Sequence, residues 1–185
     1  MEIRERFDLI KLDYEAKGVR VLFLKNYNDL PTSAGRVNAR RGDELELPRW
    51  LARILEERGV VEVKDKKLDI DTVNTYHYRE KRKTAANQLS PLPSDFYLKA
   101  RELVEELNKL IKEKPSHMLL KDREILEKNL IELAETRLLK IVRLALTSSE
   151  EFRERMTPEE TLVYMSIHDT ASTWRSYIEE IFQGE

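Results

Sequence analysis

The 185-residue sequence contains no cysteine, only 5 glycines and no long apolar run. Without cysteine, disulfides and thiolate metal sites are excluded. No apolar stretch approaches the ~18 residues needed to cross a bilayer. The first sixteen residues alternate charged and apolar side chains and show no signal-peptide core. We therefore expect an intracellular, cytoplasmic protein with no membrane contact.

Charged residues are abundant, at 37% of the chain, beside 41% hydrophobic residues. A composition rich in Lys and Glu and poor in Gly is typical of thermophilic proteins, and also of any protein built from long helices. The formal net charge of −2 argues against a dedicated nucleic-acid binder, for which a basic domain is expected. We expect direct DNA binding to be weak or absent, although a local basic patch stays possible.

Residues 1–64 are predicted to form a small β-rich module. Alternating apolar residues predict strands at 8–14, 19–26, 44–47 and 60–63, with a loop at 26–35. Pro48 fits the first position of a short helix, and Gly59 fits the position after its end. Trp50 is expected in the core, because so small a module needs its largest side chain inside.

Residues 65–71 are predicted to be a linker, and residues 72–185 an all-helical domain. Asp71 or Thr72 is expected to cap a helix running to about Gln88, and Ser94 to cap the next. A long helix is predicted over 118–146, followed by a connector over 147–156. The last helix begins at the capping box of residues 157–160. The predicted fold class is α+β, predominantly α.

Two helical faces carry apolar residues at alternating spacings of three and four, which favours helix–helix packing. The residues are Phe96, Ala100, Leu103, Leu107 and Leu110 on one helix, and Tyr164, Ile167, Ala171, Trp174, Ile178 and Ile181 on the last helix. The second face is broad for a terminal helix and leaves room for a second chain.

No pattern points to catalysis, a cofactor or a metal. His77, His117 and His168 are isolated, and none has a second ligand three or four residues away. Asp69 and Asp71 are interpreted as helix-capping residues. There is no nucleophile elbow and no glycine-rich phosphate loop. We therefore predict no catalytic, cofactor-binding or metal-binding residue.

Two charged features need an explanation. Arg79, Lys81, Arg82 and Lys83 form a basic run that is either a solvated helix face or a contact patch for phosphates or an acidic partner. Arg137, followed by Lys140, lies in register with the apolar stripe of the long helix. A buried arginine needs a paired carboxylate, which a neighbouring helix or another subunit would supply.

Three motifs, taken in order, resemble those of the GINS replication proteins. Residues 47–52 resemble the LP-x-WLA signature of the small B domain, carried by Leu47, Pro48, Trp50, Leu51 and Ala52. Residues 92–97 resemble the opening of an A-domain helix, and residues 136–141 its R-x-x-K-I element. The order B then A is typical of the Psf-two/Psf-three type, which archaea represent with one subunit. In the family an apolar residue usually follows the Leu-Pro pair, whereas this sequence has Arg49 there.

The resemblance implies a non-catalytic scaffold. It would assemble with a GINS subunit of A-then-B order, and two copies of each subunit type would form a heterotetramer. The heterotetramer would bridge the MCM helicase and a Cdc45/RecJ-like protein in a nucleoid-associated replisome of the CMG type, and contact primase or DNA polymerase. The expected subunit interface comprises Phe96, Tyr97, Ala100, Leu103, Leu107, Arg137, Lys140, Tyr164, Ile167, Trp174 and Ile178. The alternative is a nucleic-acid-binding regulator in which residues 44–64 form a winged-helix-like module and residues 79–83 its phosphate patch.

Overall fold

A computed structural model describes residues 2–32, 35–83, 88–148 and 152–183. The chain divides into two units, Met1–Lys67 and Leu68–Glu185, called here the N-terminal and the C-terminal unit. The first mixes strands and helices and the second is helical throughout its described part, so the predicted class, α+β and predominantly α, is confirmed. The first helix of the C-terminal unit begins at Ile70, inside the predicted linker.

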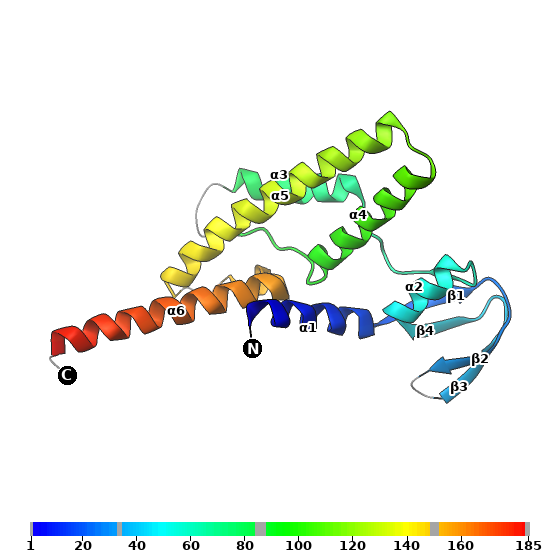
Figure 1. Cartoon of the computed structure of the whole chain (residues 1–185), viewed down its shortest axis with the longest axis horizontal. Helices are drawn as coiled ribbons and strands as arrows, with labels where there is room; N and C mark the ends of the chain where they lie inside the picture. Colours follow the sequence, from blue (N-terminus) through cyan, green and yellow to red (C-terminus); the bar gives the residue numbers. More distant parts are fainter. Residues whose placement is uncertain (1, 33–34, 84–87, 149–151, 184–185) are drawn as a thin grey trace. The chain divides into compact units, whose positions relative to one another are not determined.

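The N-terminal unit is built around a three-stranded antiparallel sheet of order β4-β1-β5 (Figure 1). Its elements are α1 (Ile3–Ala16), β1 (Gly18–Phe23), β2 (Tyr27–Thr32), β3 (Gly35–Ala39), β4 (Glu44–Pro48), α2 (Arg49–Glu57) and β5 (Val61–Val63). On β1, Val19, Val21 and Phe23 are buried in alternation and make one face of the core. The clearest strand of the sequence is thus the central strand of the sheet.

The predicted strand over residues 8–14 is wrong, because this segment lies within helix α1. The half-buried or buried apolar side chains of α1 are Phe7, Ile10 and Tyr14, at spacings of three and four. This helical period competes with the alternating pattern of the same residues, and the charged helix formers between them favour the helix. Glu2 and Glu5 close a capping box at its start.

The predicted loop over residues 26–35 is also wrong, because β2 pairs there with β3 in an antiparallel hairpin. Leu30 and Ala39 are buried in the core of the unit. The register shifts between Tyr27 and Leu30, where Asp29 adopts a positive φ of 62°. Because of this bulge, the two inward side chains of β2, Tyr27 and Leu30, lie three residues apart. The two-residue alternation typical of a strand is therefore hidden in the sequence.

Helix α2 contradicts the core prediction for Trp50. Leu51, Ala52 and Leu55 form the buried face of α2, whereas Trp50 is 46% exposed. Successive residues of a helix point about 100° apart, so the residue directly before this face lies at its rim. Gly59, with φ of 63°, follows the helix as predicted.

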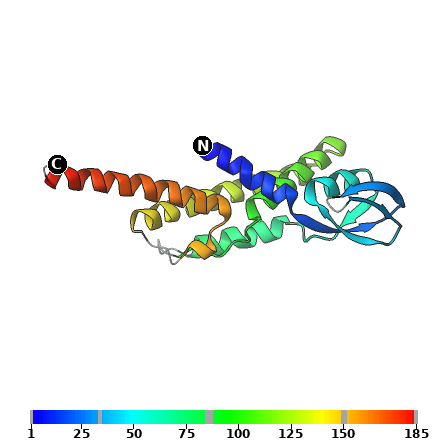
Figure 2. The same cartoon turned by 90° about the horizontal axis from the view of Figure 1, so that it is seen from below.

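The C-terminal unit contains α3 (Ile70–Arg82), α4 (Phe96–Glu113), α5 (His117–Leu146), the 3-10 turn η1 (Arg153–Arg155) and α6 (Pro158–Gln183). The long helix α5 contacts α3, α4 and α6 (Figures 1 and 2). One apolar cluster includes Phe96 and Leu133, and a second includes Ile141 and Tyr164. Leu133 and Ile141 both belong to α5, so the two clusters follow one another along this helix.

The helix ends follow the predicted caps in part. The predicted box of α6 is confirmed by reciprocal bonds between Thr157 and Glu160. Helix α5 is capped by Ser116, which was not predicted as a cap. Asp69, not Asp71 or Thr72, caps α3 by accepting from the N–H of Thr72. Helix α4 begins one residue later than predicted, with Asp95 at the position expected for Ser94. Helix α3 ends at Arg82, before the predicted end near 88. Residues 84–87 of that predicted helix and residues 149–151 of the predicted connector lie outside the described part.

Candidate subunit interface

Arg137 lies at the centre of a buried ion network on α5, with a side chain that is 0% exposed. Its guanidinium makes five hydrogen bonds. Two go to the carboxylate of Glu160, at 2.6 and 2.7 Å, and one to Glu80 at 2.9 Å. The other two reach the backbone carbonyls of Ser90, at 2.7 Å, and Arg155, at 3.0 Å. All the donors of the guanidinium are therefore used inside one unit.

Lys140, one turn further along α5, completes the network. Its ammonium donates to the carboxylate of Glu80 at 2.5 Å. It also donates to the backbone carbonyls of Glu80, Lys83 and Gln88, at 2.7 to 3.2 Å. Two cations thus meet two carboxylates, and the network is neutral. Buried charges are tolerated when they are paired and hydrogen-bonded in this way.

Glu160 connects the network to the start of α6. Its carboxylate accepts from the Tyr97 hydroxyl at 2.7 Å and from the backbone N–H of Thr157 at 3.0 Å, besides its two bonds from Arg137. The same carboxylate therefore closes the capping box of α6 and neutralises Arg137. These bonds fix the direction in which α6 leaves the other helices.

Electrostatics agree with this geometry. Burial lowers the pKa of Arg137, but hydrogen bonds and charge from Glu160, with the charge of Glu80, outweigh it and hold that pKa above its ordinary value. Burial and then the neighbouring Glu160 carboxylate raise the pKa of the Tyr97 hydroxyl well above its ordinary value. Arg137 therefore stays charged and Tyr97 stays a neutral donor at physiological pH.

The carboxylates that Arg137 requires come from α3 and α6 of its own chain. Of the two sources left open by the sequence, a neighbouring helix is the one observed. Arg137 and Lys140 belong to the motif at 136–141, and Tyr97 to the motif at 92–97. These motif residues therefore meet in one place and hold the helices together, and the structure gives them partners within the chain.

The second half of α6 presents the opposite arrangement, an apolar face open to solvent. Leu162 and Tyr164 are buried in the first half. In the second half, the side chains of Trp174, Tyr177, Ile181 and Phe182 are exposed and that of Ile178 is half-buried. The most exposed is Phe182, at 84%. These five residues, called the α6 end face, are spaced three and four apart and share one side of the helix.

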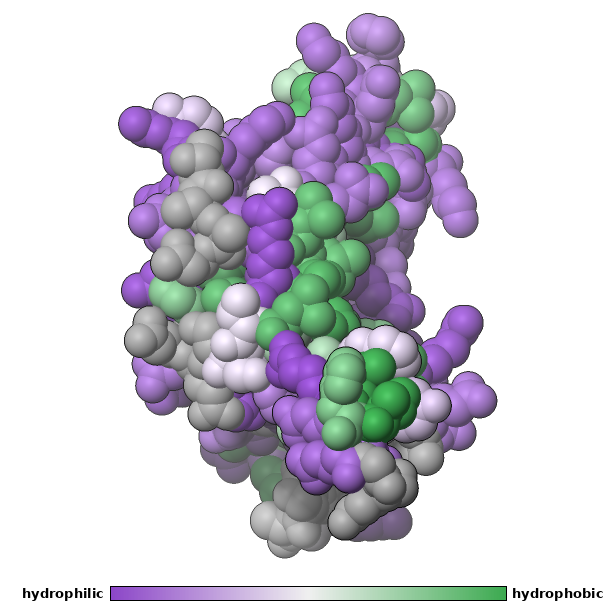
Figure 3. Space-filling model, turned by 90° about the vertical axis from the view of Figure 1, so that its left-hand side faces the viewer, coloured by the Kyte–Doolittle hydropathy of each residue, from purple (hydrophilic) through white to green (hydrophobic). Residues whose placement is uncertain are grey.

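Figure 3 shows this surface with the end of α6 towards the viewer, where apolar side chains gather. In both cartoon views the second half of α6 extends past the end of α5 (Figures 1 and 2). Exposed apolar area rimmed by polar residues marks a protein-interaction site. Aromatic side chains such as Trp174 and Tyr177 are the ones enriched among residues that dominate binding energy.

The predicted interface residues fall into two groups. Phe96, Ala100, Leu107, Arg137, Lys140 and Tyr164 are buried within the C-terminal unit, and Tyr97, Leu103 and Ile167 are partly buried. Only Trp174 and Ile178 of the predicted set belong to the α6 end face. Sequence reasoning missed Tyr177 and Phe182, although both lie three or four residues from a predicted position. The interface itself stays a prediction.

The other predicted features separate as well. Leu47, Leu51 and Ala52 are buried in the core of the N-terminal unit, and Pro48 is half-buried beside them. In the basic run, Lys81 contacts Glu132 at 3.1 Å, and Glu132 also contacts His77 at 3.0 Å. Arg79, Arg82 and Lys83 are on another side of α3, where they line a pocket.

Among the described residues, no group of three or more His, Asp or Glu side chains could hold a metal ion. Within the same residues, no helix is long and apolar enough to cross a membrane. The arrangement that the structure does offer is an internally neutralised helical frame, from which one long helix projects an apolar face. Such an arrangement is suited to holding another protein.

No curated protein matches the sequence. A family model described as the GINS complex protein helical bundle domain matches residues 67–179, which is more than half of the chain and covers most of the C-terminal unit. The match gives no support to the alternative of a nucleic-acid-binding regulator. The chain therefore belongs to the GINS family of DNA-replication complex subunits.

Proposed function

We propose that this chain is the Psf-two/Psf-three-like subunit of an archaeal GINS complex. The order of its units supports the type, because the strand-containing unit with the LP-x-WLA-like residues 47–52 precedes the helical bundle matched by the family model. GINS subunits are non-catalytic, and we assign this chain no reaction. Its role is to place other replication proteins relative to one another.

The α6 end face is the proposed contact with a second GINS subunit of A-then-B order, two copies of each forming a heterotetramer. The observation that carries this assignment is the row of exposed apolar side chains on a helix whose start is fixed by buried charges. A stable hetero-complex usually buries ~2,000 Å² or more. Five large side chains on one helix contribute to such an area and supply its apolar centre.

Co-expression with an A-then-B GINS subunit tests the assignment, with mass measured by size-exclusion chromatography and light scattering. The wild-type chain is expected to give a heterotetramer. Ile181→Asp places a charge in the α6 end face and should abolish or severely weaken assembly. Leu120→Asp is the matched control, because Leu120 is a similarly exposed aliphatic side chain on α5. Equal assembly of the two variants, or a wild-type chain that ignores the partner, contradicts the assignment.

The heterotetramer would in turn bridge the MCM helicase and a Cdc45/RecJ-like protein, and contact primase or DNA polymerase. Support for this step is the family membership and the absence of any pattern for catalysis in the sequence. Co-purification of purified components provides the test. The heterotetramer should retain both MCM and the Cdc45/RecJ-like protein. When the heterotetramer is left out, MCM should retain less of the Cdc45/RecJ-like protein. Unchanged retention without it would contradict the bridging role.

A further inference from the structure

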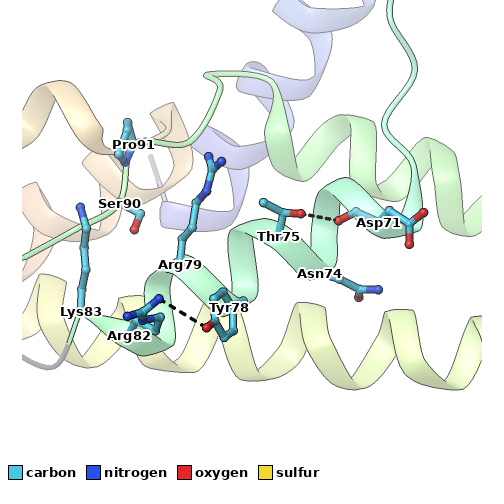
Figure 4. A pocket seen from close by; sticks show the side chains of 9 residues that line it. All are labelled: Asp71, Asn74, Thr75, Tyr78, Arg79, Arg82, Lys83, Ser90 and Pro91. Atoms are coloured by element: carbon cyan, nitrogen blue, oxygen red, sulfur yellow. Dashed lines mark hydrogen bonds between the residues drawn. The ribbon is translucent and has the colours of Figure 1, made fainter.

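A pocket of about 730 Å³ lies along one side of α3, between that helix and the segment Ser90–Pro91. Its lining follows α3 from Asp71 to Arg82 and continues to Lys83 directly after the helix, and Figure 4 shows these side chains. None of the residues that line the pocket belongs to the α6 end face. It is therefore a second surface whose purpose the assembly leaves open.

Charge is concentrated at one end of the pocket. Arg79, Arg82 and Lys83 lie three and four residues apart, and among the described residues none of them makes an ion pair. Arg82 instead lies over the ring of Tyr78, 5.5 Å from its centroid. Lys81, from the same basic run, is already paired with Glu132 outside the pocket. Three cations thus remain available to an anionic ligand.

Ser90 adds an independent sign of a binding site. Its side chain is 2% exposed, lines the pocket, and within the described chain its hydroxyl has no hydrogen-bond partner. In Figure 4 this hydroxyl points towards α3. The backbone of Ser90 is fixed by the ion network, since its N–H donates to Glu80 and its carbonyl accepts from Arg137. A buried unpaired hydroxyl on a fixed backbone is costly unless a ligand or a water molecule satisfies it.

The charge distribution distinguishes a carboxylate-bearing protein segment from a nucleic-acid strand. A strand following the pocket would carry a phosphate past Asp71, which repels it, and nucleic-acid binding needs an extended basic surface. The whole chain carries a net charge of −2. One or two carboxylates, by contrast, fit the guanidinium forks of Arg79 and Arg82 at the basic end. Tyr78 and Pro91 offer an apolar surface beside them.

We propose that this pocket docks an acidic segment of a partner protein, with its carboxylates on Arg79, Arg82 and Lys83, a hydrogen bond to Ser90, and an apolar side chain against Tyr78 and Pro91. The proposal is independent of the α6 end face and of the heterotetramer. It assigns to the α3 side of the C-terminal unit a second partner contact, one that weakens with rising salt because it is charge-based.

The test measures fluorescence anisotropy of three labelled probes with the full chain at low and physiological salt. The probes are the acidic peptide GDEFDELG, its neutral counterpart GNQFNQLG, and a twelve-nucleotide single-stranded oligothymidylate. The wild-type chain should bind the acidic peptide saturably and at least tenfold more tightly than the neutral peptide. Absence of saturable binding to the acidic peptide overturns the proposal, as does tighter binding of the oligonucleotide, which would make the pocket a polyanion site.

Variants then locate the binding. Arg79→Glu combined with Arg82→Glu should weaken binding of the acidic peptide at least tenfold, and Ser90→Ala a few-fold. Lys81→Glu is the control, because it makes a charge reversal like each of the two in the double variant, on the same helix but outside the pocket, and it should change binding less than about threefold. If the double reversal fails to fold by circular dichroism, Arg79→Gln with Arg82→Gln replaces it. Equal losses in the control and the pocket variants overturn the proposal.

Discussion

Helices α3 and α5 are joined by two charged clusters that differ in their access to water. The buried ion network joins Glu80 of α3 to Arg137 and Lys140 of α5. The second cluster joins His77 and Lys81 of α3 to Glu132 of α5 and is partly open to solvent. Both clusters pair basic side chains with glutamate across the same two helices, and they differ most in burial.

Burial makes the first cluster demanding. In the interior, every donor left without a partner costs free energy, whereas an exposed donor turns to water. This explains why the guanidinium of Arg137 makes five hydrogen bonds, to four residues from other parts of the chain. A network with so many requirements holds only one arrangement of helices. We expect the second, partly open cluster to tolerate substitution, and none of the three GINS-like motifs includes it.

The largest expected effect is that of Arg137→Met. The change removes the cation shared by Glu80 and Glu160 and leaves an uncompensated negative charge in the interior. Breaking a buried pair in this way costs about 3–5 kcal/mol of unfolding free energy. Urea unfolding followed by circular dichroism measures the loss. Arg101→Met is the matched control, because it breaks an exposed pair with Glu105 on α4 and should cost less than ~0.5 kcal/mol.

A second substitution separates charge from packing. Arg137→Met combined with Glu160→Gln removes one charge of each sign, so the remaining pair of Glu80 and Lys140 is neutral. The double variant should be more stable than Arg137→Met alone. If it is less stable by the sum of both single losses, an uncompensated charge is the wrong explanation for the first result.

A smaller, pH-dependent effect is expected from Tyr97→Phe. The variant loses the hydrogen bond to Glu160, worth about 1–3 kcal/mol near neutral pH because the buried acceptor loses one donor. Burial and Glu160 raise the pKa of Tyr97 in the folded chain above its ordinary value of 10.0. The contribution of this group is therefore fully present below pH 10 and is lost as the pH rises above it, because the unfolded chain then releases the proton first.

Unfolding free energies of the wild-type chain and of Tyr97→Phe, measured between pH 8 and pH 11, check this sign. Lys and other groups common to both chains cancel in the difference, so the difference reports on Tyr97 alone. The stability advantage of the wild type should therefore shrink above pH 10. Tyr78→Phe, at an exposed tyrosine of α3, is the control and should show no such trend. A wild-type advantage that grows with pH would contradict the assigned cause.

Much of the C-terminal unit was predictable because its signals are local. The long helix and the capping box of Thr157 and Glu160 depend on residues close in sequence. The register of Arg137 with the apolar stripe showed that a carboxylate is needed. It did not identify Glu80, which is 57 residues away. Distant pairing depends on how helices pack, which one helix does not encode.

The errors in the N-terminal unit have physical causes of the same kind. Residues 8–14 fit two periods, and the packing of Phe7 and Tyr14 decides between them. The bulge at Asp29 removes the alternation that would have revealed β2. For the interface, spacing alone cannot show which apolar residues face the core of the chain and which remain outside. Phe96 and Trp174 have similar sequence signals and opposite exposure.

The exposed cluster provides the smallest effect and completes the comparison. A hydrogen bond from Lys81, with a further one from His77, holds the pKa of Glu132 below its ordinary value of 4.5. A carboxylate whose pKa is lowered on folding contributes stability at pH values above its ordinary pKa. This contribution is lost as the pH falls through the lowered pKa of the folded chain. Because Glu132 and Lys81 are partly open to solvent, we expect no measurable change in the free energy of unfolding at neutral pH when Lys81 is replaced by Ala.

Side-chain NMR of Glu132 can detect its pairing with Lys81 even where measurements of unfolding do not. In Lys81→Ala the pKa of Glu132 should rise towards 4.5, because the main donor to its carboxylate is gone. Lys112→Ala, at an exposed lysine of α4, should leave it unchanged. A large loss of stability in Lys81→Ala would show that this cluster also holds α3 against α5. The two clusters would then differ less in their contribution than in their access to water, and the framework of the unit would extend beyond the buried charges.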